Sequence, residues 1–565
     1  MTRFQVAAAP TPTQAKALAA HDTRIQQLLV NRNIDTAAAA EAWLAPAYEA
    51  ELHDPYLLHD MDKAVTRIQQ AIAKEEQIVI FSDYDCDGIP GAVVLHDFFA
   101  AIPYAHFSNY IPHRHYEGFG LSVTAVEKLA AAGAQLLITI DCGTADMVAV
   151  ARAGELGLDV IITDHHQAKD TLPAAIAVVN PAIGDTYPFP HLCGAGVVFK
   201  LVQALLATGE YSIPAGREKW WLDMVGVATI ADMVPLTGEN RTFAHYGLQV
   251  LRKSRRPGLQ KLLRKQQASQ QHLTADDIGF TIGPRINAAS RMGAPMEAFA
   301  LLVATDDATA DTQVAILEQL NNDRKGAVAA MTRAVHGKLK NLTEIPPVLV
   351  LGDPDWKPSL VGLVANKLAE EYNVPAFVWG RDGNGVLKGS CRSDGQLSLI
   401  TLMEAAAESF ASFGGHHFSG GFSVTDDAIH TLPSALLAAH AQLGESANVL
   451  EPTIIDAVIT LEDITTTFVR TMTAIGPFGT GNPKPLFQCL NIVPTQVVVF
   501  GKTKEHTKLV FETKGVAKEA IAFFALPETF SKTPVADEPL TLIGHVEQSF
   551  FMGRLQTRLR IVDIT

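Results

Sequence analysis

Two spacings of hydrophobic and polar positions alternate along the first half of the chain. Short apolar runs rich in Val and Ile are separated by longer segments whose apolar positions recur every three or four residues. The short runs predict buried strands and the longer segments predict helices. The predicted strands are residues 78–81, 105–111, 136–140, 160–163 and 176–179, and the predicted helices include 123–132 and 147–155. This β-α alternation indicates a mostly parallel, doubly wound sheet, whose functional sites lie beyond the carboxyl ends of the strands.

The pattern changes again further along the chain. After Pro346-Pro347 a second α/β unit is predicted, with strands at 348–351 and 376–379 around a helix at 360–371. From about residue 450 short strands recur at regular spacing, which predicts a small antiparallel barrel. These strands are 454–461, 495–500, 508–512, 520–524, 540–547 and 557–562. Near its end, Phe550 and Phe551 are expected to be core residues or a platform for stacking bases.

Five regions follow from these patterns. They are a helical, alanine-rich extension (1–50), the first α/β domain (51–250), a helical connector (251–340), the second α/β domain (341–445) and a terminal β-barrel domain (446–565).

Composition restricts the class of protein. The 565 residues are 48% hydrophobic and 19% charged, which is typical of a globular protein with a large core. The net charge of −15 excludes a basic surface over the whole molecule, so a nucleic-acid partner would need a local basic groove. The five cysteines occur singly and no apolar run approaches the length of a membrane span. No secretory signal is evident either, so a cytoplasmic location is expected.

Acidic side chains follow the predicted strand 78–81. Asp83, Asp85 and Asp87 stand at alternate positions before Gly88, so their carboxylates would crowd at the end of a strand. Divalent cations that prefer oxygen ligands, such as Mg²⁺ and Mn²⁺, neutralise such a group. A calcium loop of the EF-hand type is disfavoured because a strand precedes the aspartates and Val94 stands at the twelfth position.

Two further strand ends carry residues of the same kind. Asp141 follows the strand 136–140, and Asp164-His165-His166 follows the strand 160–163. A single acid at such a place is commonly a helix cap. Acids at three strand ends of one sheet instead predict a metal site. Asp232 stands alone among apolar neighbours after a predicted helix, and because an unpaired buried carboxylate is costly, a cationic partner is expected for it.

Three glycine-containing segments are candidates for phosphate contacts. They are residues 283–291, 388–393 and 413–421, and each also carries Arg, Lys or His. Glycine lets backbone N–H groups approach a phosphate closely. The densest basic run, which begins at residues 252–256, is expected to be a solvated helix face, with a phosphate-binding groove as the weaker hypothesis.

The motifs together resemble the DHH family of phosphoesterases, and within it the branch of single-stranded-DNA-specific exonucleases. The matching segments are Asp83-Tyr84-Asp85-Cys86-Asp87-Gly88, Thr139-Ile140-Asp141-Cys142-Gly143, the name-giving Asp164-His165-His166, and residues 226–241 around Asp232. The later glycine segments resemble the accessory domain called DHHA1, and the terminal barrel resembles an OB-fold. The fold that this implies is a DHH-type parallel sheet domain, a DHHA1 α/β domain and a C-terminal OB-like β-barrel. The chain departs from the family's usual residues at Ser82, Lys357, Ser359 and Ser419.

The resemblance implies a role for each candidate residue. Two Mn²⁺ or Mg²⁺ ions would be held by Asp83, Asp85, Asp141, His165 and Asp232, with Asp164 and His166 as further catalytic residues that line or support the site. The implied substrate contacts are Arg114, Arg285, Asn287, Arg291, Ser390, Arg392 and His416. The implied activity is 5′→3′ hydrolysis of single-stranded DNA to 5′-mononucleotides by a two-metal mechanism, in DNA repair and recombination. A helicase and a single-strand-binding protein are candidate partners, and no membrane is involved.

Two alternatives stay open at this point. One is a DHH phosphodiesterase acting on short oligonucleotides or cyclic dinucleotides, although such enzymes are typically shorter and lack the terminal barrel. The other is a non-catalytic scaffold that binds single strands, although the intact metal-type residues disfavour a decayed core.

Overall fold

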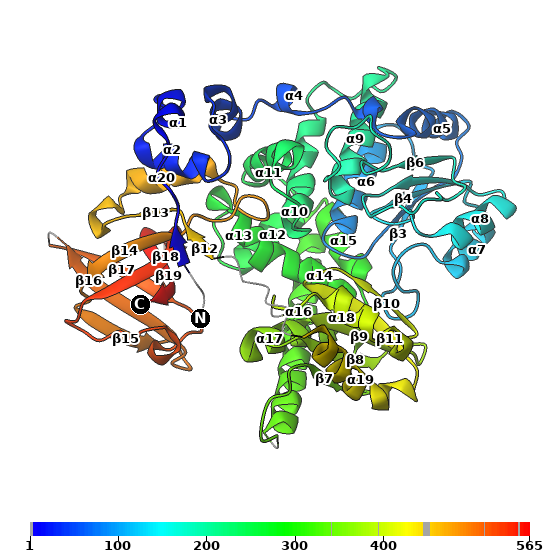
Figure 1. Cartoon of the computed structure of the whole chain (residues 1–565). Helices are drawn as coiled ribbons and strands as arrows, with labels where there is room; N and C mark the ends of the chain where they lie inside the picture. The colour runs from blue at the N-terminus through cyan, green and yellow to red at the C-terminus, as the bar shows by residue number, and fades with distance from the viewer. Residues whose placement is uncertain (1–3, 341, 394, 445–451, 514, 552–553) are drawn as a thin grey trace.

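The computed structural model describes residues 4–340, 342–393, 395–444, 452–513, 515–551 and 554–565. Figure 1 shows three bodies: the first α/β unit at the upper right, the second below it, and a β-rich C-terminal unit at the left. The long helix α16 (Asp307–Leu339) leads from the first unit into the second.

The first unit contains a five-stranded, fully parallel sheet in the order β3-β2-β4-β5-β6. Its strands are β2 (Ile78–Ser82), β3 (Phe107–Tyr110), β4 (Leu136–Ile140), β5 (Asp159–Thr163) and β6 (Ala177–Val179). Helices α5 (Met61–Ala73), α6 (Gly88–Ala101) and α9 (Gly194–Ala207) cover one face, and α7 (Val123–Ala131) and α8 (Met147–Glu155) cover the other. The predicted doubly wound sheet is confirmed, and β3 is shorter than the strand expected at 105–111.

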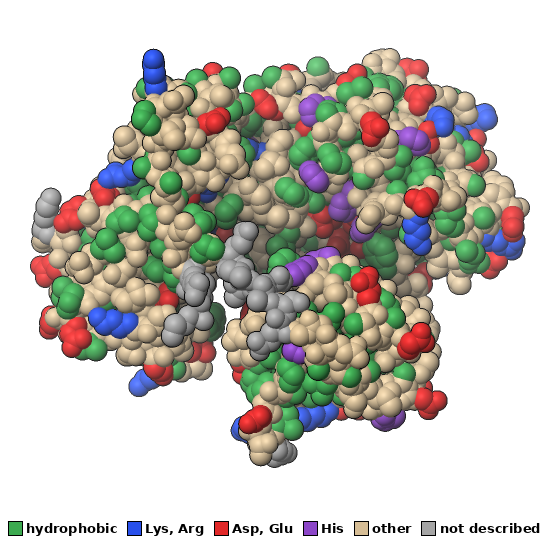
Figure 2. Space-filling view, viewed as in Figure 1, with side chains coloured by type: hydrophobic (Ala, Val, Ile, Leu, Met, Phe, Trp, Pro, Cys, Tyr) green, Lys and Arg blue, Asp and Glu red, His purple; other side chains and the backbone are tan. Residues whose placement is uncertain are grey.

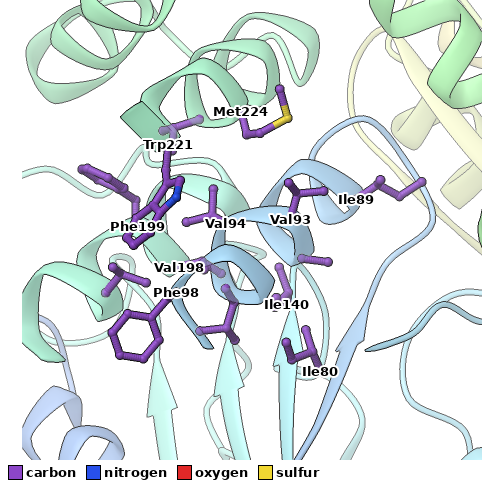
Figure 3. Close-up of a cluster of buried hydrophobic side chains, with 14 of the residues drawn as sticks. Ile80, Ile89, Val93, Val94, Phe98, Ile140, Val198, Phe199, Trp221 and Met224 are labelled. Carbon is purple, nitrogen blue, oxygen red and sulfur yellow. The ribbon is translucent and has the colours of Figure 1, made fainter. Parts of the chain in front are cut away.

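Burial on both faces explains why the strands of this sheet are continuously apolar. Along β2, Ile78 and Ile80 face one core while Val79 and Phe81 face the other. Figure 3 shows Ile80 and Ile140 of the sheet below Val93 and Val94 of α6. Each such side chain contributes about 1.5–3 kcal/mol when it is fully buried. This packing fixes the strand ends at which the acidic residues lie.

A layer of helices joins the first unit to α16. The helices are α10 (Leu222–Ala231), α11 (Gly238–Leu251), α12 (Pro257–Lys265), α13 (Ala275–Asp277), α14 (Gly283–Met292) and α15 (Pro295–Val303), with a π-helical turn η4 (Ile278–Ile282) before α14. The glycine-containing segment 283–291 therefore lies within a helix. Gly226 and Gly247 allow α10 and α11 to touch, since a Cβ on Gly247 would lie 2.5 Å from the Cα of Gly226.

The second α/β unit has a mixed sheet in the order β10-β11-β9-β8-β7. Its strands are β7 (Leu349–Gly352), β8 (Ala376–Arg381), β9 (Leu387–Arg392), β10 (Ser412–Gly415) and β11 (Ser419–Val424), and its helices are α17 (Pro358–Tyr372), α18 (Leu399–Ala405) and α19 (Ala428–Leu443). One predicted glycine segment, 388–393, falls largely on β9. The other, 413–421, forms the β10–β11 hairpin.

The C-terminal unit has a seven-stranded sheet in the order β13-β14-β18-β19-β17-β16-β15. Its strands are β13 (Ala457–Val458), β14 (Phe487–Ile492), β15 (Gln496–Phe500), β16 (His506–Thr513), β17 (Val516–Ala522), β18 (Leu540–Phe551) and β19 (Arg554–Ile564). The strands pair mostly antiparallel, as predicted, but β13–β14 and β17–β19 pair in parallel, which the sequence pattern did not indicate. The side chains of Phe550 and Phe551, predicted as core residues or a base-stacking platform, lie outside the part of the chain that the structure describes.

Two elements of this unit were missed. The helix α20 (Thr466–Ile475) is rich in Thr, which favours strands, yet it buries Phe468, Val469, Met472 and Ile475 along one helical face. Its first turn is stabilised because the Thr465 hydroxyl accepts from the backbone N–H of Phe468 (3.1 Å). The strand β14 was missed because its Gln, Cys and Asn residues are not strong strand formers.

The N-terminal region packs on the C-terminal unit, with which it shares one core. The helices that pack there are α1 (Pro12–Ala17), α2 (Thr23–Val30) and α3 (Ala37–Leu44), whereas α4 (Tyr48–Glu51) packs against α11 of the first unit. A short strand, β1 (Phe4–Val6), pairs in parallel with β12 (Thr453–Ile455). Within residues 1–50, the predicted helices are thus observed, together with a strand that was not expected.

The C-terminal unit also contacts the turn that follows α10. The backbone N–H of Leu236 donates to the carbonyl of Thr480 (2.7 Å). The buried guanidinium of Arg241 donates to the carbonyls of Trp43 and Gly476, and thereby joins all three regions. These contacts place the C-terminal unit close to Asp232.

In the described parts of the chain, no helix is both long and apolar enough to cross a membrane.

Candidate metal centre

Three neighbouring strands of the first sheet end at the predicted metal ligands. Asp83 and Asp85 follow β2, and Asp141 follows β4, which pairs with β2 in parallel. His165 lies beyond the end of β5, on the other side of β4. Because the carboxyl ends of parallel strands meet at one edge, these side chains converge there.

The turn after β2 presents two carboxylates. Asp83 is buried, and its Oδ1 has no hydrogen-bond partner among the described residues. The Oδ1 of Asp85 accepts from the backbone N–H groups of Asp87 (2.8 Å) and Gly88 (3.2 Å), where α6 begins. Residue 88 must be glycine here, because a Cβ would lie 2.5 Å from the carbonyl oxygen of Asp83. The turn therefore directs both carboxylates to the edge of the sheet.

The imidazole of His165 lies at the centre of the acidic groups. Its Nε2 is 3.1 Å from Asp141 Oδ1, 3.6 Å from Asp87 Oδ2 and 3.8 Å from Asp232 Oδ2. The backbone of Asp141 is left-handed, with a φ of 60°, and Gly194 at the start of α9 packs directly against it. This unusual conformation turns the Asp141 carboxylate toward His165.

Three overlapping groups of side chains have the spacing of a metal site. They are Asp83, Asp85 and Asp141; Asp87, His165 and Asp232; and Asp141, His165 and His166. Three of their atoms are buried and make no hydrogen bond in the part of the chain that the structure describes: Asp83 Oδ1, Asp141 Oδ1 and His165 Nε2. The last two lie 3.1 Å apart, but not in hydrogen-bonding geometry. Buried polar atoms are almost always satisfied, so unsatisfied ligand atoms that point to one place fit bound cations. Carboxylates with one histidine suit Mn²⁺ or Mg²⁺.

The electrostatics agree with this assignment. Burial, and next the charge of Asp85, raises the pKa of Asp83 well above its usual range. Burial followed by the charges of Asp87, Asp85, Asp83 and Asp232 does the same to the pKa of Asp141. Such clustered carboxylates repel one another, and a cation between them removes the repulsion.

Asp232 lies at the C-terminal end of α10 and completes the group. Burial and the charges of Asp87, Asp85 and Asp83 raise its pKa to about 9. The expected cationic partner is not a Lys or Arg, because no such side chain lies within 4.0 Å of Asp232 among the described residues. His165, with its Nε2 at 3.8 Å, is the basic group that the described residues place within 4.0 Å of it, and Asp232 belongs to one of the three groups with the spacing of a metal site.

Asp87 is a candidate ligand that sequence reasoning did not assign. It is buried, its carboxylate accepts from the backbone N–H groups of Gly194 (2.6 Å) and Ala195 (2.8 Å), and Oδ2 faces His165. Burial is the main reason that its pKa is raised. The signal was present in the sequence, since Asp87 continues the alternation of Asp83 and Asp85.

Asp164 and His166 support the site from one side. The carboxylate of Asp164 accepts from the backbone N–H groups of Thr144, His165 and His166 and from His166 Nδ1 (2.8 Å). Although burial opposes it, the hydrogen bond and charge of His166 lower the pKa of Asp164 below its usual range. The same hydrogen bond raises the pKa of His166, whose side chain is about half exposed. Asp164 thus orients the histidine pair rather than facing the ligand cluster.

Four arginines gather beside the metal centre. The guanidinium of Arg114 lies 4.7 Å from the ring centre of Tyr84, next to Asp83. Burial, followed by the nearby charges of Arg114, Arg324 and Arg392, lowers the pKa of Arg291 to about 9. Among the described residues no carboxylate lies within 4.0 Å of any of the four. An arginine cluster without an acidic partner is suited to bind phosphate. Arg324, on α16, was not among the predicted contacts.

The second α/β unit supplies the other predicted substrate contacts. Ser390 and Arg392 lie on β9, and both approach Gly362 on α17. His416 is exposed in the β10–β11 hairpin, where its Nε2 is 2.9 Å from Ser419 Oγ. Figure 2 shows histidine and acidic side chains in the hollow between the two α/β units. The hollow thus has metal-type residues on one wall and the DHHA1-like unit on the other.

Two predicted substrate contacts have other partners. Asn287 Oδ1 accepts from the backbone N–H of Cys86 (3.0 Å), so Asn287 holds the turn after β2. The buried guanidinium of Arg285 donates to Glu318 Oε1 (2.5 Å), to the carbonyl of Thr281 and to Gln266. These partners occupy the N–H groups with which Arg285 was expected to contact DNA. Arg285 instead joins α14 to α16 and to the end of α12.

The basic run at 252–256 is divided: Lys253 and Arg255 are exposed, as expected for a solvated face, whereas Arg252 and Arg256 have structural partners. Arg256 forms ion pairs with Asp223 (2.9 Å) and Asp97 (2.5 Å), and Arg252 donates to the carbonyl of Leu273. At Arg252 and Arg256, neither the predicted solvated face nor the predicted phosphate groove is observed, because each guanidinium bonds to protein groups between packed helices.

Family models match three parts of the chain. The N-terminal domain of the DHH family matches residues 77–229, the DHHA1 domain matches 346–445, and the RecJ OB domain matches 455–563.

Relatives match over most of the length. The chain is 34% identical to the single-stranded-DNA-specific exonuclease RecJ of Bacillus subtilis over 95% of this chain and 67% of that protein. It is 30% identical to the RecJ of Haemophilus influenzae over 83% of this chain and 84% of that protein. The crystal structure of RecJ in complex with Mn²⁺ from Thermus thermophilus is 26% identical, covers all of this chain and 79% of its own, and superposes with a TM-score of 0.82. The structure of the same protein in complex with Mg²⁺ superposes with a TM-score of 0.76.

Proposed function

The chain belongs to the RecJ family of DHH phosphoesterases, and we propose on this basis that it is an exonuclease specific for single-stranded DNA. It hydrolyses phosphodiester bonds in the 5′→3′ direction and releases 5′-mononucleotides, in DNA repair and recombination. The observation that carries the proposal is the cluster of unsatisfied ligand atoms on Asp83, Asp141 and His165, which lies beside arginines that have no acidic partner among the described residues.

Two Mn²⁺ or Mg²⁺ ions are proposed as cofactors, as in the related RecJ complexes. The proposed ligands are Asp83, Asp85, Asp141, His165 and Asp232, with Asp87 as an additional candidate. When bound, such ions supply a water of lowered pKa and positive charge opposite the phosphate oxygens.

The remaining side chains orient the reactants. Asp164 holds His166 through its Nδ1, which leaves the Nε2 of this half-exposed histidine for the substrate. The hydrogen bond to Asp164 raises the pKa of His166 and so favours the protonated ring, the form that can donate to a phosphate oxygen.

The arginine cluster sets the polarity of the reaction. Arg114, Arg291 and Arg392, with Ser390, are proposed to hold the 5′-phosphate next to the metal ligands. Charge-assisted contacts from arginine to phosphate are strong and geometrically specific. His416 is proposed to approach the scissile phosphate from the hairpin, and the OB unit is proposed to hold the rest of the strand.

Partners and location follow from the same proposal. Because the substrate is single-stranded, a helicase and a single-strand-binding protein are proposed partners. All five cysteines are unpaired and buried, which suits a reducing cytoplasm. The five regions expected from the sequence are kept as the proposed domain division, with the N-terminal helices assigned to the OB unit's core.

Substitution of one central ligand tests the proposal. Asp141→Asn is expected to abolish Mn²⁺-dependent digestion of a single-stranded oligonucleotide while its binding, measured by anisotropy, is retained. The control is Asp159→Asn. Asp159 begins β5, at the edge of the sheet opposite the metal ligands, and its carboxylate pairs with Arg67. Full activity in Asp141→Asn, or equal loss in both variants, would contradict the proposal.

A further inference from the structure

Ser359, on the first turn of α17, forms a reciprocal pair of hydrogen bonds with Arg291, at the end of α14. The Ser359 hydroxyl donates to the carbonyl of Arg291 (2.8 Å), and Arg291 Nη1 donates to the carbonyl of Ser359 (2.5 Å). Ser359 is 4% exposed, and both bonds are at least partly buried. They connect the helical layer of the first unit with the DHHA1 unit.

The Arg291 carbonyl lies in the last turn of its helix. Carbonyls at this place have no partner within the helix and need one from elsewhere. The second partner here is His115 Nε2, at 3.1 Å. Because His115 adjoins Arg114, one carbonyl joins the loop that carries Arg114 to the helix that carries Ser359.

Further contacts close the same junction. Gly293, which ends α14 with a φ of 93°, packs against His113, since a Cβ at this position would lie 2.9 Å from His113 Nε2. On the DHHA1 side, the backbone N–H of Gly383 donates to the carbonyl of His115 (3.3 Å). The position of Arg114 is therefore defined by both units.

The helix α17 also packs against Arg392 and Ser390, the proposed phosphate contacts on β9. A Cβ on Gly362, one turn after Ser359, would lie 3.3 Å from both Arg392 Nη2 and Ser390 Oγ. Arg114, Arg291 and Arg392 come from three separate segments, namely the loop after β3, the helix α14 and the strand β9. No single element therefore fixes the spacing between them. Ser359 is bonded directly to one of them and lies on the helix that packs against another.

We propose that Ser359 is a positioning residue that holds Arg291, and with it the spacing of Arg114 and Arg392, in the geometry that recognises a 5′-phosphate. This inference rests on the proposed function and adds to it a residue that makes no substrate contact itself. Because the spacing matters only for a ligand that spans the arginines, Ser359 acts on the recognition of the phosphorylated end and leaves the metal ligands unchanged.

The experiment compares oligonucleotides that differ only at the 5′ end. Digestion of a 5′-phosphorylated and a 5′-hydroxyl single strand is measured with Mn²⁺ for the wild type and for Ser359→Ala. The variant keeps the backbone carbonyl that accepts from Arg291 Nη1 and loses only the hydroxyl bond to the Arg291 carbonyl. It is expected to raise the KM for the phosphorylated strand up to about tenfold, as the loss of one buried hydrogen bond allows, with kcat and the 5′-hydroxyl reaction unchanged. Ser359→Cys, which is close in volume and a weaker donor, is the second variant if the alanine protein is not recovered folded.

The control is Thr332→Val. It removes a buried hydroxyl that donates to the carbonyl of Val328 (2.9 Å) on α16, the helix packed against α17, and it should leave both reactions unchanged. An unchanged preference for the phosphorylated end in Ser359→Ala, or an equal loss on both strands, overturns the inference. If the wild type itself does not distinguish the two ends, the proposed phosphate site fails instead.

Discussion

Asp232→Asn is expected to stabilise the metal-free protein and to destabilise it relative to the wild type when Mn²⁺ is present. The pKa of Asp232 is raised to about 9, first by burial and then by Asp87, Asp85 and Asp83. Below the unfolded pKa of about 3.9, both the folded and the unfolded chain carry this proton, and the stabilising contribution of the group is complete. As the pH rises from there toward 9, the unfolded chain releases the proton while the folded chain keeps it, so the stability falls. An asparagine has no proton to lose, so this loss is absent from the variant.

The size of this loss in stability follows from the difference between the pKa of Asp232 in the unfolded and in the folded chain. Between about 3.9 and pH 7, roughly three pH units, the unfolded chain releases the proton and the folded chain keeps it, at about 1.4 kcal/mol for each unit. The wild type without metal should therefore lose up to about 4 kcal/mol from this group between pH 4 and pH 7. In the presence of Mn²⁺ at 100 times its dissociation constant, the wild type gains about 2.7 kcal/mol for each ion bound. The variant forfeits that gain at any site that needs Asp232.

Urea unfolding followed by tryptophan fluorescence measures both effects, since Trp221 is buried at the start of α10. It is run at pH 4 and pH 7 with a chelator, and at pH 7 with Mn²⁺. The matched control is Asp223→Asn on the same helix, where the buried carboxylate is paired with Arg256 and accepts from the Ser254 hydroxyl. That variant should lose roughly 3 kcal/mol with or without metal, because it leaves a buried arginine without one of its partners.

The account is refuted if Asp232→Asn is less stable than the wild type in chelator at pH 7. It is refuted equally if Mn²⁺ stabilises both proteins to the same extent. Either result would mean that Asp232 is not part of a repelling cluster that a cation relieves.

Three further predictions concern other parts of the site. Gly88→Ala places a Cβ 2.5 Å from the Asp83 carbonyl oxygen, so it should lower the free energy of unfolding by about 1–3 kcal/mol and weaken Mn²⁺ binding. An unchanged melting temperature together with an unchanged Mn²⁺ titration would contradict this. Arg392→Gln should weaken binding of a 5′-phosphorylated strand by roughly 10- to 100-fold, measured by anisotropy against the 5′-hydroxyl strand, because a charge-assisted contact is lost; equal weakening of both would place Arg392 elsewhere. Arg285→Met should lower stability by about 3 kcal/mol, since Glu318 loses its ion-pair partner and keeps only the hydrogen bond from Gln266. The KM for DNA should stay unchanged, and a raised KM would restore Arg285 as a substrate contact.

The parallel sheet and its metal edge could be predicted from the sequence because local pattern determines both. The runs 78–81 and 136–140 are apolar at nearly every position, which indicates strands buried on two faces, and the acids follow them closely. The order of strands then requires Asp83, Asp141 and His165 to meet. Asp87 was grouped with Asp83 and Asp85 but not assigned as a ligand, because the local pattern does not show that backbone N–H groups from α9, over 100 residues later, orient its carboxylate.

Side chains with long-range partners could not be assigned in this way. Arg285 and Arg291 lie six residues apart on one helix, yet the first pairs with Glu318 and the second faces Arg114 and Arg392. Only the packing of α14 against α16 and α17 distinguishes them. The helix α20 was missed for a related reason, since burial of Phe468 and Met472 in the C-terminal core outweighs the strand preference of its threonines.

The most direct test of the central claim is the digestion, with Mn²⁺, of a single-stranded oligonucleotide labelled at one end, beside its duplex and a cyclic dinucleotide. The account predicts mononucleotides released from the 5′ end of the single strand, with the duplex and the cyclic dinucleotide intact. Hydrolysis of the cyclic dinucleotide alone, or tight binding of the single strand without any hydrolysis, would contradict it.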